Sequence, residues 1–178
     1  MDTKIKKSGM GKTANLNGES VSKNSPVIHF EGAADELASH LGLIKAMLPD
    51  AQTRQFIEEI QKKLIKLMAH VSDTSNGRYC FTNDETYALE TETERLSLNC
   101  PKQSSFLLPG RSVTEAQIHI ARTVARRAER MFFAVNEECS LCPNAAQYLN
   151  RLSDYLYVLS QQEPAEDHCV SSSSSSVS

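Results

Sequence analysis

Apolar residues recur at helical spacing along most of this 178-residue chain. From about Ala33 they return every three or four residues until Pro49, which cannot continue a helix. A second stripe of the same period runs from about Ala51 to Val71, and the sequence Ser-Asn-Gly at 75–77 breaks it. The pattern therefore predicts two amphipathic helices with a short connection between them.

A third, shorter helix is predicted from Asp84 to Leu98. Asn83 precedes it and has the short polar side chain that caps helix N-termini. Pro101 lies just beyond its end, where proline is common because it cannot extend the helix. These signals place a helix boundary on each side of the segment.

Two longer helices are predicted in the last third of the chain. Ser112 and Glu115 have the spacing of a capping box, so the fourth helix is expected to begin there and to run to about Asn136. After the loop EECSLCPN, leucines at helical spacing predict a fifth helix over about 144–162. No alternating pattern longer than a few residues indicates a strand, so we expect an all-α, five-helix bundle.

Composition divides the chain into three parts. Residues 1–28 are rich in Lys, Ser, Gly and Asn and lack sustained helical periodicity, which predicts an irregular N-terminal arm. Residues 29–163 carry the predicted bundle. Residues 164–178 end in a run of serines, which is typical of disordered segments.

The overall charge gives no reason to expect a nucleic acid or a membrane surface as partner. The net charge is -3 and the pI is about 6.0, so any anion-binding site must be local. No apolar run reaches the roughly 18 residues of a membrane span, and the sequence MDTKIKKSGMGKT lacks the apolar segment of a signal peptide. We expect a soluble, cytoplasmic protein.

The cysteines are predicted to be free thiols in reducing surroundings. They are odd in number and no secretion signal precedes them: Cys80, Cys100, Cys139, Cys142 and Cys169. The CxxC spacing at 139–142 has no second pair or nearby histidine to complete a zinc site, and the histidines show no ligand spacing. The sequence therefore predicts no metal held by protein side chains.

The segment ARTVARRAER at 121–130 contains four arginines and one glutamate. On a helix, four residues of this region face the core: Ala121, Ala125, Ala128 and Phe132. Arg122 and Glu129 then lie along one edge of that stripe, Arg126 lies further out, and Arg127 projects from another face. Arg122 and Arg126 could grip a polyphosphate or a carboxylate. An ordinary charged helix face with routine ion pairs is the alternative.

A second candidate anion site is the N-terminal sequence KKSGMGKT at 6–13. It is similar to the end of a phosphate-binding P-loop but has Lys6 where that motif requires glycine. Gly9 and Gly11 free backbone N–H groups to approach an anion, and lysines at 6, 7, 12 and 23 add positive charge. Phosphate contact and a merely flexible terminus both remain open.

Five segments in a fixed order resemble one protein family. They are the Gly-rich arm, DEL at 35–37, FLLPG at 106–110, ARTVARRAER, and YLNRLSDYL at 148–156, in which Asn150 lies beside a leucine stripe. By spacing alone, an asparagine beside a core is more often a structural residue whose hydrogen bonds are satisfied. In combination, the segments resemble the propanediol-utilisation-type ATP:cob(I)alamin adenosyltransferases, the family that also includes the enzyme of methylmalonic aciduria type B, over roughly residues 3–162.

The resemblance implies a homotrimer of five-helix bundles with active sites between subunits. It implies transfer of the 5′-deoxyadenosyl group from ATP to cobalt(I) of a corrinoid, with triphosphate released and Mg²⁺ as cofactor. An adenosylcobalamin-dependent client enzyme and a cobalamin reductase are the further partners it suggests. A catalytically impaired relative that only binds ATP or the corrinoid is the alternative, and a helical module that binds an acidic partner is a third hypothesis.

The resemblance also implies roles for individual residues. Arg126 would hold the triphosphate, Arg122 would approach the nucleotide and pair with Asp35 of a neighbouring subunit, and Glu129 would support both arginines. Phe106 would lie against the lower face of the corrin. The remaining ATP contacts would come from Asn150 and from residues of the arm: Ser8, Gly9, Gly11, Lys12, Thr13 and Lys23.

Three positions depart from the family's pattern. Gly9 stands where the family has an aspartate, Ala38 replaces the asparagine after DEL, and Arg111 replaces the second glycine of LPGG. The cobalt of the corrinoid would itself be the nucleophile, which explains why no activated serine, cysteine or general base is evident. We therefore expect the protein to contribute positioning and charge.

Overall fold

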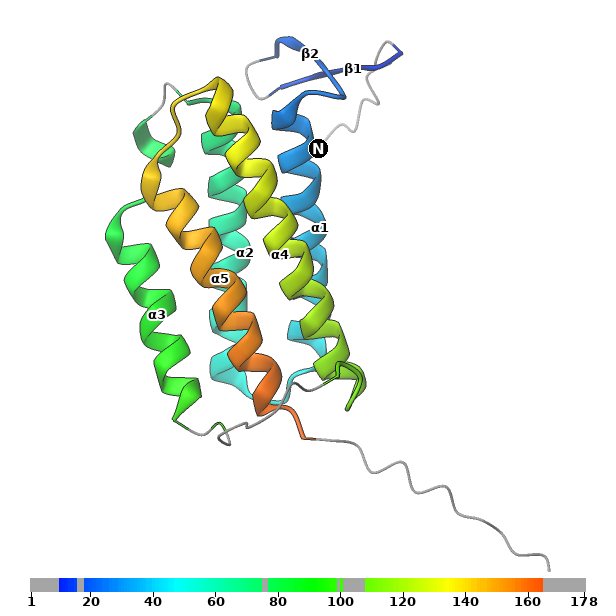
Figure 1. The fold of residues 1–178 in the computed structure, drawn as a ribbon, viewed down its shortest axis with the longest axis vertical. Helices are drawn as coiled ribbons and strands as arrows, with labels where there is room; N and C mark the ends of the chain where they lie inside the picture. The colour runs from blue at the N-terminus through cyan, green and yellow to red at the C-terminus, as the bar shows by residue number, and fades with distance from the viewer. Residues whose placement is uncertain (1–9, 16–17, 75–76, 99, 101–107, 165–178) are drawn as a thin grey trace, which may run out of the picture.

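The computed structural model describes residues 10–15, 18–74, 77–98, 100 and 108–164 (Figure 1). The expected all-α bundle is confirmed, with a small hairpin and one 3-10 turn (η1) added. In chain order the elements are β1 (Lys12–Ala14), β2 (Ser20–Ser22), α1 (Pro26–Met47), α2 (Ala51–Ser72), η1 (Gly77–Tyr79), α3 (Asn83–Ser97), α4 (Val113–Glu138) and α5 (Pro143–Gln162). None of these helices is long and apolar enough to cross a membrane, within the part of the chain that the structure describes.

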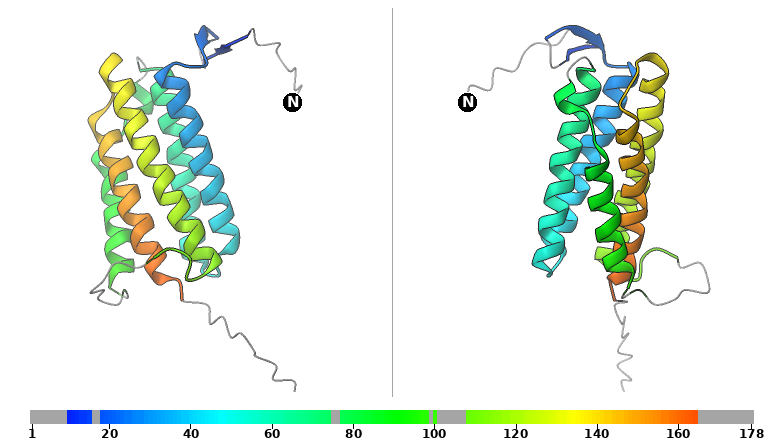
Figure 2. Two further views of the ribbon diagram at one scale, coloured as in Figure 1. Left: turned by 45° about the vertical axis from the view of Figure 1, so that its right-hand side comes forward. Right: turned by 90° about the vertical axis from the view of Figure 1, so that its left-hand side faces the viewer.

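The five helices run side by side along the long axis of the molecule (Figures 1 and 2). α1 packs against α2 and α4, α4 also packs against α5, and α3 packs against α5 at one edge. The β-hairpin lies across the end of the bundle where α1 begins (Figure 2). This arrangement places the arm's described residues close to one end of α1.

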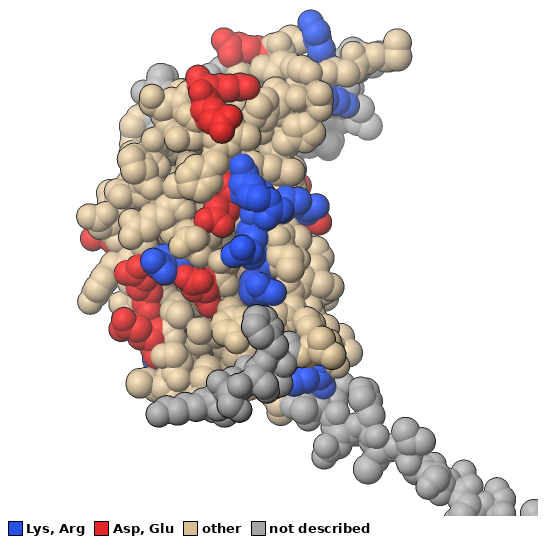
Figure 3. Space-filling view, in the orientation of Figure 1, with Lys and Arg blue, Asp and Glu red and all other residues tan. Residues whose placement is uncertain are grey.

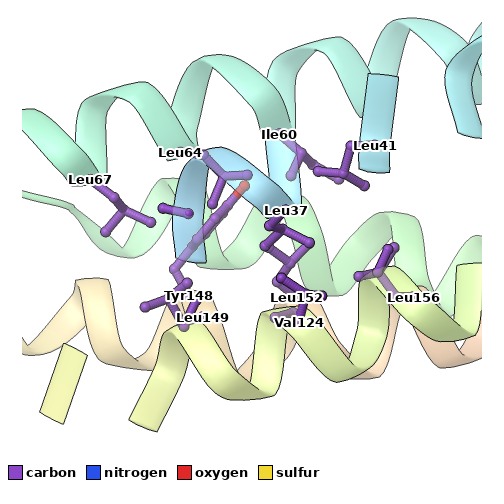
Figure 4. Close-up of a cluster of buried hydrophobic side chains, with 14 of the residues drawn as sticks. Leu37, Leu41, Ile60, Leu64, Leu67, Val124, Tyr148, Leu149, Leu152 and Leu156 are labelled. Atoms are coloured by element: carbon purple, nitrogen blue, oxygen red, sulfur yellow. The ribbon is translucent and has the colours of Figure 1, made fainter. Parts of the chain in front are cut away.

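Leucine, isoleucine and aromatic side chains from several helices fill the centre of the bundle (Figure 4). Leu37 and Leu41 of α1 meet Ile60 and Leu64 of α2 in this cluster, with α5 leucines on the opposite side. All four of these side chains are essentially inaccessible to solvent. Burial of this kind supplies the main favourable free energy of folding.

α1 begins at Pro26, seven residues earlier than the periodicity starting at Ala33 predicted. Ser25 has extended backbone angles, and its hydroxyl accepts a hydrogen bond from the N–H of Ile28 at 3.5 Å. Proline suits the first helical position because its missing N–H would have no partner there. Phe30 is fully buried, so the apolar stripe extends back one turn beyond Ala33.

The described part of the arm contains a hairpin that the sequence did not predict. β1 and β2 pair antiparallel, with Thr13 opposite Val21, and their three-residue length is too short to show alternation. Gly11 has a φ of 74°, a left-handed conformation that favours glycine. Its carbonyl accepts a hydrogen bond from the N–H of Lys23 at 2.9 Å, which ties the two ends of the hairpin together.

The caps of α3 and α4 differ in detail from the prediction. Thr82, not Asn83, caps α3, and Thr82 and Glu85 form a complete capping box. Ser112 caps α4 as predicted and accepts from the N–H of Glu115 at 3.1 Å. The Glu115 carboxylate, however, accepts from the backbone N–H groups of Gly110 and Arg111.

Cys80 and Cys142 form a disulfide, so the prediction of free thiols is wrong for these two residues. Cys100 and Cys139 are free, and Cys169 lies outside the described residues. The bond joins the segment after η1 to the start of α5 across 62 residues of sequence. By loop-closure entropy, such a crosslink stabilises the folded chain by about 4 kcal/mol.

Glu85 connects the start of α3 to α2 by a partly buried charge cluster. Its Oε1 lies 2.6 Å from Nζ of Lys66 and 3.5 Å from Nζ of Lys63. The other carboxylate oxygen accepts from the Thr82 hydroxyl and N–H. Burial opposes ionisation of Glu85, but these donors and the Lys66 charge lower its pKa to about 2. The ionised carboxylate is therefore favoured by folding.

Glu85→Gln is expected to make the acid unfolding of this protein less steep. In the folded protein the pKa of Glu85 is below the ordinary value of 4.5, so the ionised carboxylate adds roughly 3 kcal/mol to the free energy of unfolding above pH 4.5. This stabilisation disappears as the pH falls through about 2. Urea unfolding of both proteins between pH 7 and 2 measures the difference. Lys66→Gln should reproduce part of the effect, and parallel pH profiles for wild type and Glu85→Gln would contradict this assignment.

Candidate functional site

A column of basic side chains runs along α4 on one face of the molecule (Figure 3). The predicted core stripe lies behind it, because Ala121, Ala125, Ala128 and Phe132 are all buried. Arg126 and Arg130 are exposed, and Arg122 is half-buried. The spacing therefore predicted correctly which side of this helix faces the core.

The arginines of α4 differ in what they contact. Arg127 forms an ion pair with Glu36 of α1, so it has a structural partner within the chain. Within the part of the chain that the structure describes, the Arg126 guanidinium has no ion pair. Its planar fork of N–H donors matches the oxygens of a phosphate or a carboxylate. Arg126 is thus a candidate on this helix for an anionic ligand, as is Arg130, whose Nη1 donates only to the Arg126 carbonyl among the described residues.

Glu129 and Asn150 are brought together from α4 and α5. The Asn150 amide donates to Glu129 Oε1 at 3.0 Å, although 21 residues separate the two in sequence. Asn150 is exposed, which rules out a buried structural asparagine. The hydrogen bond fixes which side of the amide carries the nitrogen and leaves the amide oxygen available as an acceptor. These two predicted residues therefore form one polar edge beside the arginines.

Arg122 makes a contact that the sequence did not predict. Its Nε–H donates to Nδ1 of His119 at 3.3 Å, and Nε2 of His119 lies 3.2 Å from Glu115 Oε1. Glu115 is fully buried and His119 is nearly so. The three residues recur at spacings of four and three, so the signal that could have revealed this row was the helical period itself.

Two predicted site residues, one in the arm and one in α1, line a cavity that does not include the α4 arginines. It has a volume of about 980 Å³ and lies between the hairpin, α1, α2 and η1. Thr13 and Asp35 belong to its lining. Three basic groups and one phenol also line it and were not predicted: Lys62, Lys66, Arg78 and Tyr79. The cavity combines donors suited to phosphate with enough volume for a nucleotide.

The remaining arm residues can be placed only in part. Lys12 in β1 and Lys23 directly after β2 are both exposed, and Gly11 forms the turn before β1. Ser8, Gly9 and Phe106 lie outside the described residues. The prediction that these three contact substrates therefore stays a prediction.

Asp35 and Arg122 do not meet within one chain. The Asp35 side chain lines the cavity beside α2, whereas Arg122 contacts His119 on α4. No ion pair or hydrogen bond between described residues joins Thr13 or Asp35 to the predicted site residues of α4 and α5, although other α1 and α4 side chains, such as Glu36 and Arg127, do pair.

Among the described residues, no group of three or more His, Cys, Asp or Glu side chains could hold a metal ion. Any Mg²⁺ at this site would need phosphate oxygens and water for most of its coordination.

The bundle and its exposed arginine face define a helical protein with a basic surface along α4. The family model for cobalamin adenosyltransferase matches residues 3–163. This chain therefore belongs to the cobalamin adenosyltransferase family, as the motifs from the arm to α5 predicted.

Proteins of known function support this membership. The chain is 38% identical over 163 residues to the corrinoid adenosyltransferase PduO of Citrobacter freundii, covering 89% of this chain and 48% of that protein. It therefore spans about half the length of this PduO relative. A shorter corrinoid adenosyltransferase of the same organism is 32% identical, and the match covers 89% of this chain and 93% of that protein. The cobalamin adenosyltransferase of Cupriavidus metallidurans is 37% identical, with 85% and 82% of the two chains covered.

The bundle also matches solved structures. A variant of the PduO-type ATP:corrinoid adenosyltransferase from Lactobacillus reuteri, complexed with cobalamin and ATP, superposes with a TM-score of 0.78. The two chains are 27% identical, and the match covers 85% of this chain and 87% of the other. A second variant of that enzyme, complexed with ATP, gives a TM-score of 0.77 at 28% identity, with 85% and 88% covered.

Proposed function

We propose that this protein transfers the 5′-deoxyadenosyl group of ATP to cobalt(I) of a corrinoid. The observation that carries the proposal is the edge formed by Arg122, Arg126, Glu129 and Asn150 on a bundle that belongs to this family. Solved relatives with the same fold bind cobalamin and ATP. The arginines suit a triphosphate, and the proposed reaction needs no activated nucleophile from the protein because the corrinoid cobalt supplies it.

The chemistry is a nucleophilic substitution at C5′ of the ribose. The cobalt(I) electron pair forms a Co–C bond while the C5′–O bond breaks, and triphosphate leaves with the electron pair of that bond. Cobalt is thereby oxidised to cobalt(III), and no proton transfer is required at C5′. The protein's contribution is to align the two substrates and to stabilise the charge that builds on the leaving oxygen.

Arg126 would stabilise that charge. Its exposed guanidinium has no partner among the described residues, so a triphosphate would not have to displace an existing ion pair. Asn150, oriented by Glu129, would accept or donate a hydrogen bond at the nucleoside end of ATP. Bound Mg²⁺ would supply further charge neutralisation, held largely by the phosphates.

The active site is proposed to form between subunits of a homotrimer. Support comes from the two separate sets of residues, because Thr13 and Asp35 line the hairpin cavity while the arginines lie on α4. Asp35 and Arg122 are each without an ion pair among the described residues, so each is free to pair across an interface. Phe106 would form the apolar wall below the corrin, and Lys12 and Lys23 would add charge near the phosphates.

Incubation with ATP, Mg²⁺ and chemically reduced cobalamin is expected to yield adenosylcobalamin and triphosphate in equal amounts. The absorption spectrum follows the corrinoid product, and chromatography measures triphosphate. If adenosylcobalamin forms no faster with the protein than without it, the proposed enzyme activity is rejected. In that case, retention of ATP or corrinoid binding in equilibrium dialysis would favour a relative that binds without turnover.

A further inference from the structure

A row of polar side chains continues along α4 from the turn that precedes it to the arginine face. Arg111 Nε lies 3.3 Å from Glu115 Oε1, and Glu115 Oε1 lies 3.2 Å from His119 Nε2. His119 Nδ1 in turn accepts from Arg122 Nε at 3.3 Å. We infer that Glu115 and His119 are positioning residues that hold the Arg122 guanidinium for the nucleotide, an inference that rests on the proposed adenosyl transfer.

The donors and acceptors of this row fix the state of the imidazole. Arg122 Nε–H can only donate, so Nδ1 of His119 must be the unprotonated nitrogen. Nε2 then carries the proton and donates to Glu115. The carboxylate thereby sets the tautomer and the ring orientation, and the ring sets the direction of the arginine. Glu115 therefore orients His119, and His119 orients Arg122.

Glu115 is itself held by groups that favour its ionised form. Its carboxylate is fully buried and accepts from the N–H groups of Gly110 and Arg111. Burial opposes ionisation, but these donors and the Arg111 side chain lower the pKa of Glu115. Arg111 also donates to the Ser160 carbonyl of α5 at 3.1 Å. Arg111, which replaces the second glycine of LPGG, therefore supplies the charge that a buried Glu115 needs.

The surroundings of His119 favour the neutral imidazole. Burial lowers the pKa of His119, and the positive charge of Arg122 lowers it further, while Glu115 acts in the opposite direction. Neutral imidazole leaves Nδ1 as an acceptor, so the hydrogen bond to Arg122 persists. The Arg122 guanidinium thus keeps one fixed N–H and presents its remaining donors outward.

Two substitutions separate the two hydrogen bonds of His119. His119→Gln places an amide nitrogen near the Nε2 position and removes the acceptor for Arg122, whereas His119→Asn places an amide oxygen near Nδ1 and preserves that acceptor. We expect His119→Gln to lower kcat/KM for ATP about 10-fold and to leave the KM for the corrinoid unchanged. His119→Asn should recover most of this loss.

A double-mutant cycle with Arg122→Lys shows whether His119 acts through the arginine. Lysine has no Nε–H at the matching position, so His119→Gln should cause little further loss in that background. Equal loss in the Asn and Gln variants, or an undiminished loss beside Arg122→Lys, would overturn the inference. Melting temperatures of all variants identify any that fail to fold.

A measurement without substrates separates this inference from the proposed reaction. In ¹⁵N-labelled protein, the Arg122 Nε–H should exchange slowly with water in the wild type and rapidly in His119→Gln. Slow exchange in a wild type that forms no adenosylcobalamin would support the positioning contact and reject the proposed reaction. Rapid exchange in an active wild type would reject the contact alone.

Discussion

Arg126→Lys is expected to lower turnover about 100-fold while leaving the bundle folded. Lysine retains the positive charge but loses the planar fork that binds two phosphate oxygens at once. Arg126 is exposed and makes no ion pair among the described residues, so its replacement removes no contact that the isolated chain needs. The loss should therefore appear in kcat, where the charge on departing triphosphate develops.

The adjacent residue provides a matched control. Arg127→Lys makes the same chemical change one position along α4, but Arg127 pairs with Glu36 instead of facing the proposed nucleotide. An ion pair this exposed contributes about 0–1 kcal/mol, so we expect near-normal turnover and a small change in stability. Rates of adenosylcobalamin formation and urea unfolding for both variants make the comparison. Wild-type turnover in Arg126→Lys would remove Arg126 from its proposed role.

The features that the sequence predicted correctly depend on short-range periodicity. The side of α4 that faces the core followed from Ala121, Ala125 and Ala128, and the start of that helix followed from Ser112. Both signals lie within one or two helical turns, so no knowledge of neighbouring helices was needed. The early start of α1 was missed because the composition of the arm obscured the cap at Ser25.

The features that the sequence did not predict depend on which elements become neighbours. The Cys80–Cys142 disulfide joins segments 62 residues apart, and spacing along the chain does not show that they meet. Lys62 and Lys66 join Asp35 in one cavity only because α1 packs against α2. The contacts of Glu115 and His119 differ from these, because they lie within one helix and their helical spacing can be read from the sequence. The burial of the two side chains could not be read from it.

Reversing the charge of Asp35 is expected to weaken the trimer that the proposed active site requires. If Asp35 pairs with Arg122 of a neighbouring subunit, Asp35→Arg places two cations together and should raise the concentration for half-assembly roughly 10-fold or more. Arg122→Asp should have a similar effect by placing two carboxylates together. Because Asp35 is exposed in the single chain, the bundle itself should remain folded.

Combining the two substitutions tests the pairing directly. A chain with Asp35→Arg and Arg122→Asp can form the reversed pair across the interface, so sedimentation equilibrium should show a recovered trimer. Turnover should stay low, because the reversed Arg122 position can no longer attract the nucleotide. Glu36→Gln is the control, because Glu36 lies next to Asp35 in sequence but pairs with Arg127 inside its own chain. Removing the Glu36 charge should leave trimer assembly unchanged. A trimer that is equally weak in the double and single variants would show that Asp35 and Arg122 do not pair. Recovery of the trimer in the double variant would place Asp35 and Arg122 of one active site on different subunits.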